Sequence, residues 1–257
     1  MISRVGVVAD GSDGHLPADF INPIFAYSLN RKLRYLYDGD WFRFREGDVE
    51  KDYPSNTPDF DNEVRLVRMY DQKEKYGVSK VDAIAPSVAE QPILIKRNNL
   101  IVAVFEQGHF LEIKGLESLV VDEFHILATC KSDYPRPAFG MWGNSQSVTV
   151  EPSTEAVGKF TVNRNRGGML TSTGNTYGCF YGFDASQNKQ RVMSVNDIGH
   201  NVKTETVASI DNIAIGRKDS RYYNGEVLEV VMHLSDLEQH NGSTITNNTI
   251  EYYNGYQ

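Results

Sequence analysis

The chain has 257 residues, of which 40% are hydrophobic and 23% charged, so it can bury a sizeable core without a metal ion or a disulfide. Its formal net charge of −8 argues against nucleic acid and anionic membranes as partners, because both require clustered lysine and arginine. The 14 tyrosines, 12 phenylalanines and 21 glycines suit many strands joined by turns.

The cysteines and the apolar runs indicate in which cellular compartment the protein is expected and whether it enters a membrane. Only Cys130 and Cys179 are present, without metal-ligand spacing, so we expect two buried free thiols and a reducing compartment. A disulfide between them is the open alternative. No apolar run approaches the ~18 residues of a membrane helix, and the N-terminus becomes polar too soon for a signal peptide. We therefore expect no membrane insertion.

Residues 1–21 are predicted to form an N-terminal arm in front of a single domain over residues 22–257. The arm holds one brief apolar run, Val5 to Ala9, followed by a turn rich in glycine and aspartate. This turn lacks the bidentate glutamate of a calcium loop, so we predict a surface turn or a docking segment, and no metal site.

A helix is predicted over residues 22–37, followed by a strand at 41–46. Asn22 is a good N-cap, Pro23 is tolerated at the first helical position, and Gly39 follows the end. Apolar residues recur at helical spacing, namely Phe25, Leu29, Leu33 and Leu36.

From Pro92 onward the pattern is one of successive strands separated by turn residues. Asn98-Asn99 between two apolar runs signals a hairpin. The predicted strands are 93–96, 100–105, 110–113, 124–131, 138–142, 147–151, 158–162, 168–172, 178–183, 191–195 and 202–209. Their spacing of about 8 to 12 residues predicts a sandwich of two antiparallel sheets.

The chain ends with a strand pair and a tail. Two strand-like runs, Ile213 to Gly216 and Glu226 to Leu234, flank a polar connection that closes with Asn224-Gly225. In the second run one parity is wholly apolar (Leu228, Val230, Met232 and Leu234), which predicts a face packed on a second sheet. A short C-terminal helix is predicted after Ser243 as N-cap.

Several short segments resemble the opening of the arabinofuranosidase B catalytic domain, and also phage virion proteins that carry this module. The matching segments are Ala26-Tyr27-Ser28-Leu29, Arg31-Lys32-Leu33, Tyr37-Asp38-Gly39, Tyr70-Asp71-Gln72 and Gln91-Pro92. The chain departs where Met69 replaces a tryptophan and where residues 73–77 replace small flexible residues. The resemblance implies an all-β, concanavalin A-like (laminin-G-like) jelly-roll sandwich with a short N-terminal and a short C-terminal helix.

No catalytic residue or cofactor is predicted. A glycosidase needs two carboxylates about 5 to 9.5 Å apart, and no Asp or Glu stands in a pattern that identifies such a pair. Asp71, in the family-like segment, is interpreted as a buried structural residue. The six histidines have no metal-ligand spacing, so no zinc site is expected.

A carbohydrate site is predicted at Trp142, with Asn144 and Tyr177 beside it. Gly140 and Gly143 flank the tryptophan and leave a ring face open for stacking on a sugar. The competing interpretation, which the strand pattern favours, is that Trp142 belongs to the core, since every second residue of a sandwich strand is buried. Tyr222 and Tyr223, in a polar loop, are predicted to be exposed and to bind a sugar or a neighbouring subunit.

The resemblance favours a non-enzymatic phage virion component, such as a tail fibre, tip, collar or capsid decoration protein, assembled in the host bacterial cytoplasm. Its expected partners are other virion proteins, a host cell-surface glycan and further copies of itself. Two alternatives stand beside this interpretation. One is a glycoside hydrolase of arabinofuranosidase type, and the other is an architectural virion subunit without a ligand.

Overall fold

The structure is a computed structural model. It describes residues 16, 18, 23–73, 81–116, 119–121, 124–132, 136–143, 147–151, 158–162, 165–170, 176–184, 189–194, 207–233, 248, 249, 252 and 253. For part of these residues, including all of 158–162, 165–170, 176–184 and 189–194, only the backbone is described.

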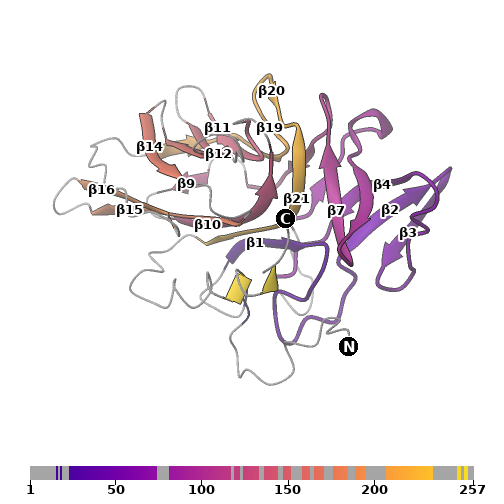
Figure 1. Ribbon diagram of the computed structural model, residues 1–257. Coiled ribbons are helices and arrows are strands. Elements are labelled where there is room, and N and C mark those ends of the chain that lie inside the picture. Colours follow the sequence, from indigo (N-terminus) through magenta and orange to yellow (C-terminus); the bar gives the residue numbers. More distant parts are fainter. Residues whose placement is uncertain are drawn as a thin grey trace.

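The described strands form two antiparallel layers (Figure 1). The first layer contains, in spatial order, β1 (Pro23–Ser28), β21 (Gly225–His233), β10 (Phe124–Lys131), β15 (Thr176–Asp184) and β16 (Lys189–Ser194). The second contains β14 (Asn165–Leu170), β13 (Gly158–Val162), β12 (Ser147–Glu151), β11 (Phe139–Trp142), β18 (Asn212–Ile215) and β8 (Leu111–Ile113). The predicted sandwich of two antiparallel sheets is confirmed.

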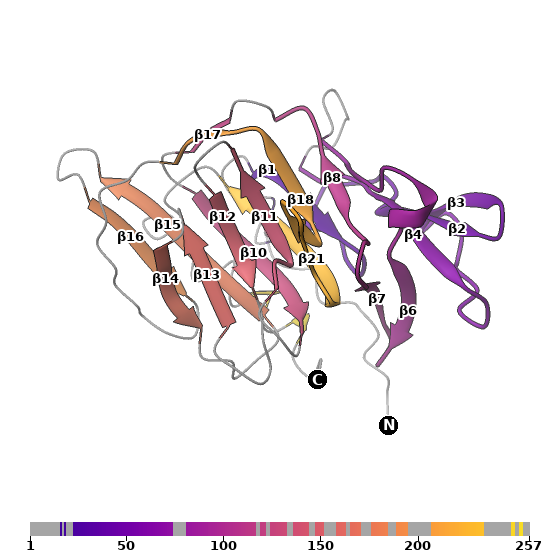
Figure 2. The same cartoon turned by 90° about the horizontal axis from the view of Figure 1, so that it is seen from above.

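The two layers are joined at one end, on the right of Figure 2, where the sheet curls from one into the other. This closed end contains β2 (Phe42–Glu46), β3 (Val49–Tyr53), β4 (Val64–Met69), β5 (Ala83–Ile84), β6 (Ile93–Arg97) and β7 (Leu100–Phe105). One half of β4 pairs with β6, which leads through β7 to the first layer, and the other half pairs with β5, which leads to β8. A single strand therefore closes the sandwich.

Smaller elements complete the described part of the chain. They are the 3₁₀ helix η1 (Val88–Glu90) and the strand pairs β9 (Leu119–Val121) with β17 (Val207–Ile210) and β19 (Arg217–Lys218) with β20 (Arg221–Tyr222). The predicted hairpin at Asn98-Asn99 joins β6 to β7, and both asparagines have positive φ (49° and 65°), as a tight hairpin turn requires.

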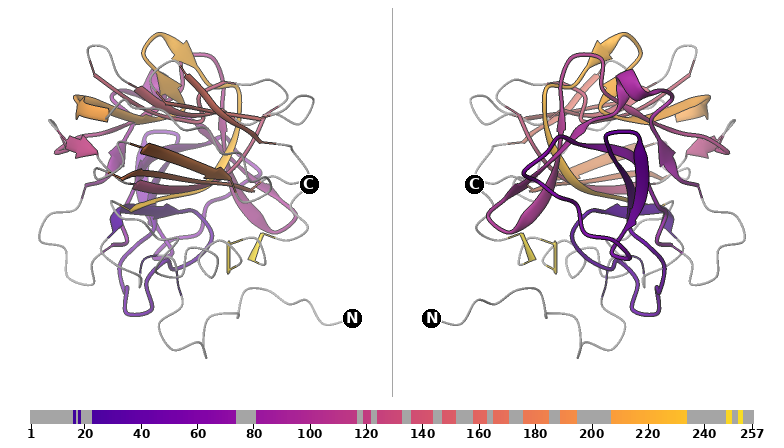
Figure 3. Two further views of the ribbon diagram at one scale, coloured as in Figure 1. Left: turned by 90° about the vertical axis from the view of Figure 1, so that its left-hand side faces the viewer. Right: turned by 90° about the vertical axis from the view of Figure 1, so that its right-hand side faces the viewer.

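The core lies between the two layers. Figure 3 shows these layers from their ends. Alternate residues of β1 and β11 point inward, so Phe25 and Tyr27 of β1 face Phe139 and Met141 of β11. The rings of Phe25 and Phe139 bridge the two layers with centroids 5.8 Å apart. Cys130 is part of this core and is a buried free thiol, as predicted; the side chain of Cys179 lies outside the described part.

The predicted N-terminal helix is wrong. Residues 23–28 form β1, which pairs with β21, and residues 29–41 follow without a helix. All six side chains of β1 are buried, because both faces of this strand are covered. A helix would bury only one stripe, and the expected stripe residue Leu36 is 54% exposed. Tertiary pairing has overridden local helix propensity here.

The central strand β21 confirms the predicted long apolar strand and adds a bulge. Its register against β10 shifts beyond Thr129, so that Val227 and Val230 both point into the core. Leu228 and Glu229, between them, face the outer side of the first layer. The expected simple alternation therefore holds only from Glu229 onward.

The C-terminal tail is described at four positions. Asn248, Thr249 and Tyr252 have helical backbones, and the Tyr253 N–H donates to the Thr249 carbonyl at 3.1 Å, which is one helical turn. The rest of the predicted helix, and the predicted arm except Leu16 and Ala18, lie outside the described residues. Within the described part, no helix has the length and apolar character that a membrane crossing needs.

Candidate functional site

The outer face of the second layer around Trp142 is the candidate site. Phe139 and Met141 of β11 point into the core, so Gly140 and Trp142 point to the opposite face. Trp142 is partly exposed there. The fully buried core position that the strand pattern favoured is therefore wrong, and the binding of a sugar at this ring stays a prediction.

The β19–β20 hairpin lies directly on this face. A Cβ atom at Gly140 would come within 2.7 Å of the Arg217 carbonyl oxygen and 2.8 Å of the Lys218 Cβ. Only glycine allows this approach. The sequence argument that Gly140 leaves the Trp142 ring open is therefore wrong, since the space beside Gly140 is filled by the hairpin.

Arg217 connects the hairpin to two aromatic rings and a carboxylate. Its guanidinium carbon lies 3.7 Å from the ring centroid of Phe110 and 5.8 Å from that of Trp142. Its Nη2 donates to Glu112 Oε1 at 3.0 Å. Cation–π contact and ion pairing together fix the guanidinium beside the tryptophan.

A second carboxylate, Glu151, lies at the other side of the same face. Arg221 Nη2 donates to Glu151 Oε1 at 2.8 Å, and the Thr149 hydroxyl donates to the same oxygen at 3.2 Å. The Glu151 side chain is only 6% exposed, whereas that of Arg221 is 43% exposed. The arginine is therefore the part of this pair that a ligand can reach.

The geometry suits ligand contact better than bond cleavage by these two carboxylates. Glu112 is in β8 and Glu151 in β12, with β18 and β11 between them. Three inter-strand steps of about 4.8 Å separate the strands by about 14 Å. Glu151 is also displaced along β12 by two residues from Thr149, which is in register with Glu112. Two carboxylates that flank one glycosidic bond lie much closer together.

Of the other two predicted site residues, only Tyr177 belongs to the described part of the chain. Asn144 lies outside the described residues. Tyr177 is in β15, where its backbone is paired with Ala128 of β10 in the first layer. Its side chain is not described. The Tyr177 backbone therefore lies in the first layer, whereas Trp142 lies in the second.

The predicted exposure of the tyrosine pair is half wrong. Tyr223 is fully buried, and its hydroxyl donates to the Lys131 carbonyl at 2.6 Å. Its ring packs on Phe105 with centroids 6.1 Å apart. Tyr222 remains partly exposed and packs against Phe110, next to Arg217. Of the two, only Tyr222 is available to a ligand or a neighbouring subunit.

The residues missed from sequence are Glu112, Glu151, Arg217 and Arg221. Glu112 and Glu151 each alternate with apolar residues in a strand. This alternation predicts that both side chains point away from the core, but not that they lie on the same outer face as Trp142. The two arginines belong to a stretch that the sequence showed only as a polar connection. Their assembly needs the strand order β8–β18–β11–β12, which local patterns do not contain.

Asp71 is structural, as predicted, although the helix expected beside it is absent. Its Oδ1 accepts the N–H groups of Ala26 at 2.9 Å and Lys73 at 3.1 Å. Lys73 Nζ lies 3.7 Å from Oδ2. Burial raises the pKa of Asp71 to about 7, because a charge is poorly solvated there. The carboxyl is fully enclosed and has no access to a substrate.

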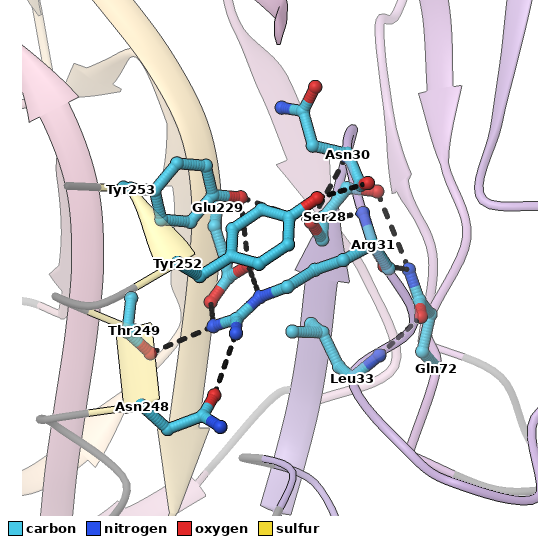
Figure 4. Close-up of polar contacts among 10 residues, drawn as sticks. All are labelled: Ser28, Asn30, Arg31, Leu33, Gln72, Glu229, Asn248, Thr249, Tyr252 and Tyr253. Carbon is cyan, nitrogen blue, oxygen red and sulfur yellow. Dashed lines mark hydrogen bonds and ion pairs between the residues drawn. The ribbon is translucent and has the colours of Figure 1, made fainter. Parts of the chain in front are cut away.

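Gln72 performs a similar task for the segment after β1 (Figure 4). Its Oε1 accepts the Leu33 N–H at 2.9 Å, and its Nε2 donates to the carbonyls of Ser28 and Arg31. The family-like segments around residues 26–33 and 70–72 therefore form one scaffold of buried hydrogen bonds.

An open groove at the closed end of the sandwich is a weaker candidate. It has a volume of about 500 Å³ and is lined by Arg45, Glu46, Gly47, Asp59, Asn62, Glu63, Arg65 and Val88. Its polar groups bind one another, as in the Arg65–Glu63 pair at 2.7 Å and the Asn62–Asp59 hydrogen bond at 2.8 Å. No aromatic ring lines it, so it lacks a stacking surface for a sugar.

No metal centre is found in the part of the chain that the structure describes. There, no group of three or more His, Cys, Asp or Glu side chains is arranged to hold an ion.

Comparison with known proteins identifies the fold. No family model matches the sequence, and no curated protein matches it. Solved structures do match, among them an arabinofuranosidase complexed with arabinofuranosyl-α-1,2-xylobiose (TM-score 0.61). A Glu-to-Gln variant of a GH54 α-L-arabinofuranosidase soaked with 4-nitrophenyl α-L-arabinofuranoside also matches (TM-score 0.60). Both are 11% identical over 89% of this chain, which spans 62% of theirs.

These matches correct the leading interpretation from sequence. The chain was expected to be a non-enzymatic phage virion component, but the solved structures that share its fold are arabinofuranosidases, which are enzymes. The resemblance to the arabinofuranosidase fold is confirmed, and the virion and non-enzyme interpretations are wrong.

Proposed function

We propose that this chain is a glycoside hydrolase module that acts on an arabinose-containing glycan bound across the Trp142 face. The observation that carries the proposal is the fold match to arabinofuranosidases over 89% of the chain. A fold alone permits many functions, so the residues on the face supply the second support.

The Trp142 face has the parts that sugar recognition needs. The partly exposed tryptophan ring offers a flat apolar surface for the C–H face of a furanose ring. Arg221, which is exposed at its tip, can donate to sugar hydroxyls while Glu151 holds it in place. We assign substrate contact to these residues, and we assign no catalytic role to Glu112 or Glu151 because of their separation.

The test is hydrolysis by the intact chain. Incubation with 4-nitrophenyl α-L-arabinofuranoside and with arabinoxylan between pH 4 and pH 8 should release 4-nitrophenol and arabinose. Trp142→Ala should raise KM about 5- to 150-fold, the equivalent of about 1–3 kcal/mol of lost contact. Trp142→Phe, which keeps a ring, should recover most of the loss.

Two results would overturn the proposal. If the folded chain releases no sugar from any arabinose-containing substrate over this pH range, it is not a hydrolase of this class. If hydrolysis occurs but Trp142→Ala leaves KM unchanged, the substrate lies elsewhere on the molecule.

A further inference from the structure

We propose that the outer face of the first layer around Arg31 is a peptide-docking site, occupied here by Asn248, Thr249, Tyr252 and Tyr253 from the C-terminal segment of the same chain. We further propose that this segment can be supplied by a separate molecule. We call the receiving surface the Arg31 site and define it as Asn30, Arg31, Val102, Leu228 and Glu229. The inference is independent of the hydrolase proposal.

Arg31 and Glu229 form the charged centre of the site (Figure 4). Arg31 Nε and Nη2 donate to Glu229 Oε2 and Oε1 at 2.8 and 2.6 Å, a bidentate pair between the segment after β1 and the bulge of β21. The side chains are 7% and 1% exposed. A buried ion pair is stable only if the remaining donors are also satisfied.

The C-terminal segment satisfies those donors. Arg31 Nη1 donates to Asn248 Oδ1 at 2.7 Å, and Nη2 donates to the Thr249 hydroxyl at 2.9 Å. The Tyr253 hydroxyl donates to Glu229 Oε2 at 2.9 Å. Three side chains of the segment thus complete the coordination of one ion pair.

The two tyrosines cover the pair and the apolar surface next to it. The Arg31 guanidinium carbon lies 4.6 Å from the ring centroid of Tyr252 and 5.5 Å from that of Tyr253. The Tyr252 hydroxyl donates to the Asn30 carbonyl at 2.7 Å. Tyr253, which is 4% exposed, packs with Val102 and Leu228 in a small apolar cluster outside the main core.

These contacts have the form of a recognition site with a sequence-specific ligand. The two tyrosine rings cover an apolar surface, and the Asn and Thr side chains one turn earlier hydrogen-bond to the same arginine. The site therefore recognises the pattern Asn-Thr-x-x-Tyr-Tyr through all four side chains together. The receiving residues belong to the turn after β1, to β7 and to β21, all of which are paired or hydrogen-bonded without the tail. The site should therefore persist when its own segment is weakened.

The experiment uses the full chain with its own segment disabled. In the Tyr252→Ala/Tyr253→Ala variant, a fluorescent peptide of residues 244–257 is titrated and followed by anisotropy. We expect saturable binding at least tenfold tighter than to the wild-type chain, whose own segment competes. A peptide that carries the same two substitutions should bind at least tenfold more weakly, and an added Arg31→Lys substitution, which cannot form the bidentate pair, should abolish binding.

The proposal is overturned if the folded variant does not bind the peptide, or if both peptides bind equally. Equal affinity for wild-type and variant chains would also overturn it, because the peptide would then occupy a different surface. Circular dichroism checks the fold. If the double variant is unfolded, Tyr252→Ala alone replaces it, since Tyr252 is only partly buried, and the same comparison of peptides decides.

Discussion

At the scale of single residues, the buried groups show how context sets chemistry. Asp71 belongs to a short segment that resembles arabinofuranosidase sequences, yet its hydrogen bonds to Ala26 and Lys73 and its complete burial make it part of the scaffold. Trp142 differs from Asp71 because it is partly exposed. The strand pattern favoured a core position for it, but strand parity directs it to the outer face, where it is partly exposed.

The raised pKa of Asp71 predicts a dependence of stability on pH. The folded value is about 7 and the unfolded value about 3.9, so the folded protein binds an extra proton between them. This contribution to the free energy of unfolding is full below about pH 4 and is lost as pH rises through about 7. The shift of about 3 units sets an upper limit of about 4 kcal/mol.

The measurement compares chemical unfolding of wild type and Asp71→Asn between pH 4 and pH 8. The amide introduced by this substitution keeps an acceptor oxygen for the N–H groups of Ala26 and Lys73 but cannot ionise, so wild-type stability should fall relative to the variant as pH rises. Other titrating groups cancel in the difference. A difference that stays flat would show that Asp71 ionises as in the unfolded chain, and one that grows in favour of wild type would show a lowered pKa; either result contradicts the prediction.

Gly140 is predicted to be irreplaceable by alanine. The added methyl would overlap the Arg217 carbonyl and the Lys218 side chain at under 3 Å, so the β19–β20 hairpin must move. Gly140→Ala should destabilise the fold by about 1–3 kcal/mol in a denaturant titration. Val49→Ala, at a 56% exposed position, serves as the control and should change stability by less than about 0.5 kcal/mol. Equal stability of Gly140→Ala and wild type would argue against the tight hairpin contact.

At the scale of elements, long-range pairing decided what short-range pattern could not. The segment 22–37 has helical spacing of apolar residues, but β21 offers it an open edge, and pairing there buries every side chain of β1. The bulge in β21 similarly follows from its partners, because the strand must pair with β10 on one side and with both β7 and β1 on the other.

The Arg31–Glu229 pair is expected to be the strongest coupling between elements outside the core. Burial alone would lower the pKa of Arg31, but the Glu229 carboxylate reverses this and raises the pKa above its usual value. Arg31→Met or Glu229→Gln should each cost about 3–5 kcal/mol, because each leaves a buried partner uncompensated.

A double-mutant cycle measures that coupling. The Arg31→Met/Glu229→Gln variant should lose clearly less stability than the sum of the single losses, since neither charge then remains buried alone. The exposed pair Arg45–Glu50 is the matched control and should show a coupling of no more than about 1 kcal/mol. Additive losses at Arg31 and Glu229 would contradict a direct ion pair.

At the scale of the whole molecule, the layers are linked too closely to unfold apart. β21 pairs with three strands, and β4 connects both layers at the closed end. We therefore predict a single calorimetric transition for residues 22–257, with equal calorimetric and van't Hoff enthalpies. Two transitions that stay separate at every scan rate would show two domains instead.

The sequence by itself determined the strand class of the fold and most strand positions. Alternating apolar residues and turn pairs such as Asn98-Asn99 are local signals, because the side-chain period and the turn geometry depend on neighbouring residues only. The apolar character of β21 and the burial of Cys130 were also predictable from the hydrophobicity of these residues. The burial of Asp71 was predictable from the resemblance of its segment to arabinofuranosidase sequences.

Only the tertiary structure decided the conformation of β1, the burial of Tyr223 and the assembly of the Trp142 face. Each depends on a contact between residues far apart in the chain: β1 on β21, Tyr223 on Phe105 and Lys131, and Trp142 on Arg217. The free energy of such contacts comes from pairing and burial across the sandwich, which exceeds the small local preferences that a sequence pattern expresses. For this reason most strands could be predicted one by one, whereas β1 and the surface that the strands form together could not.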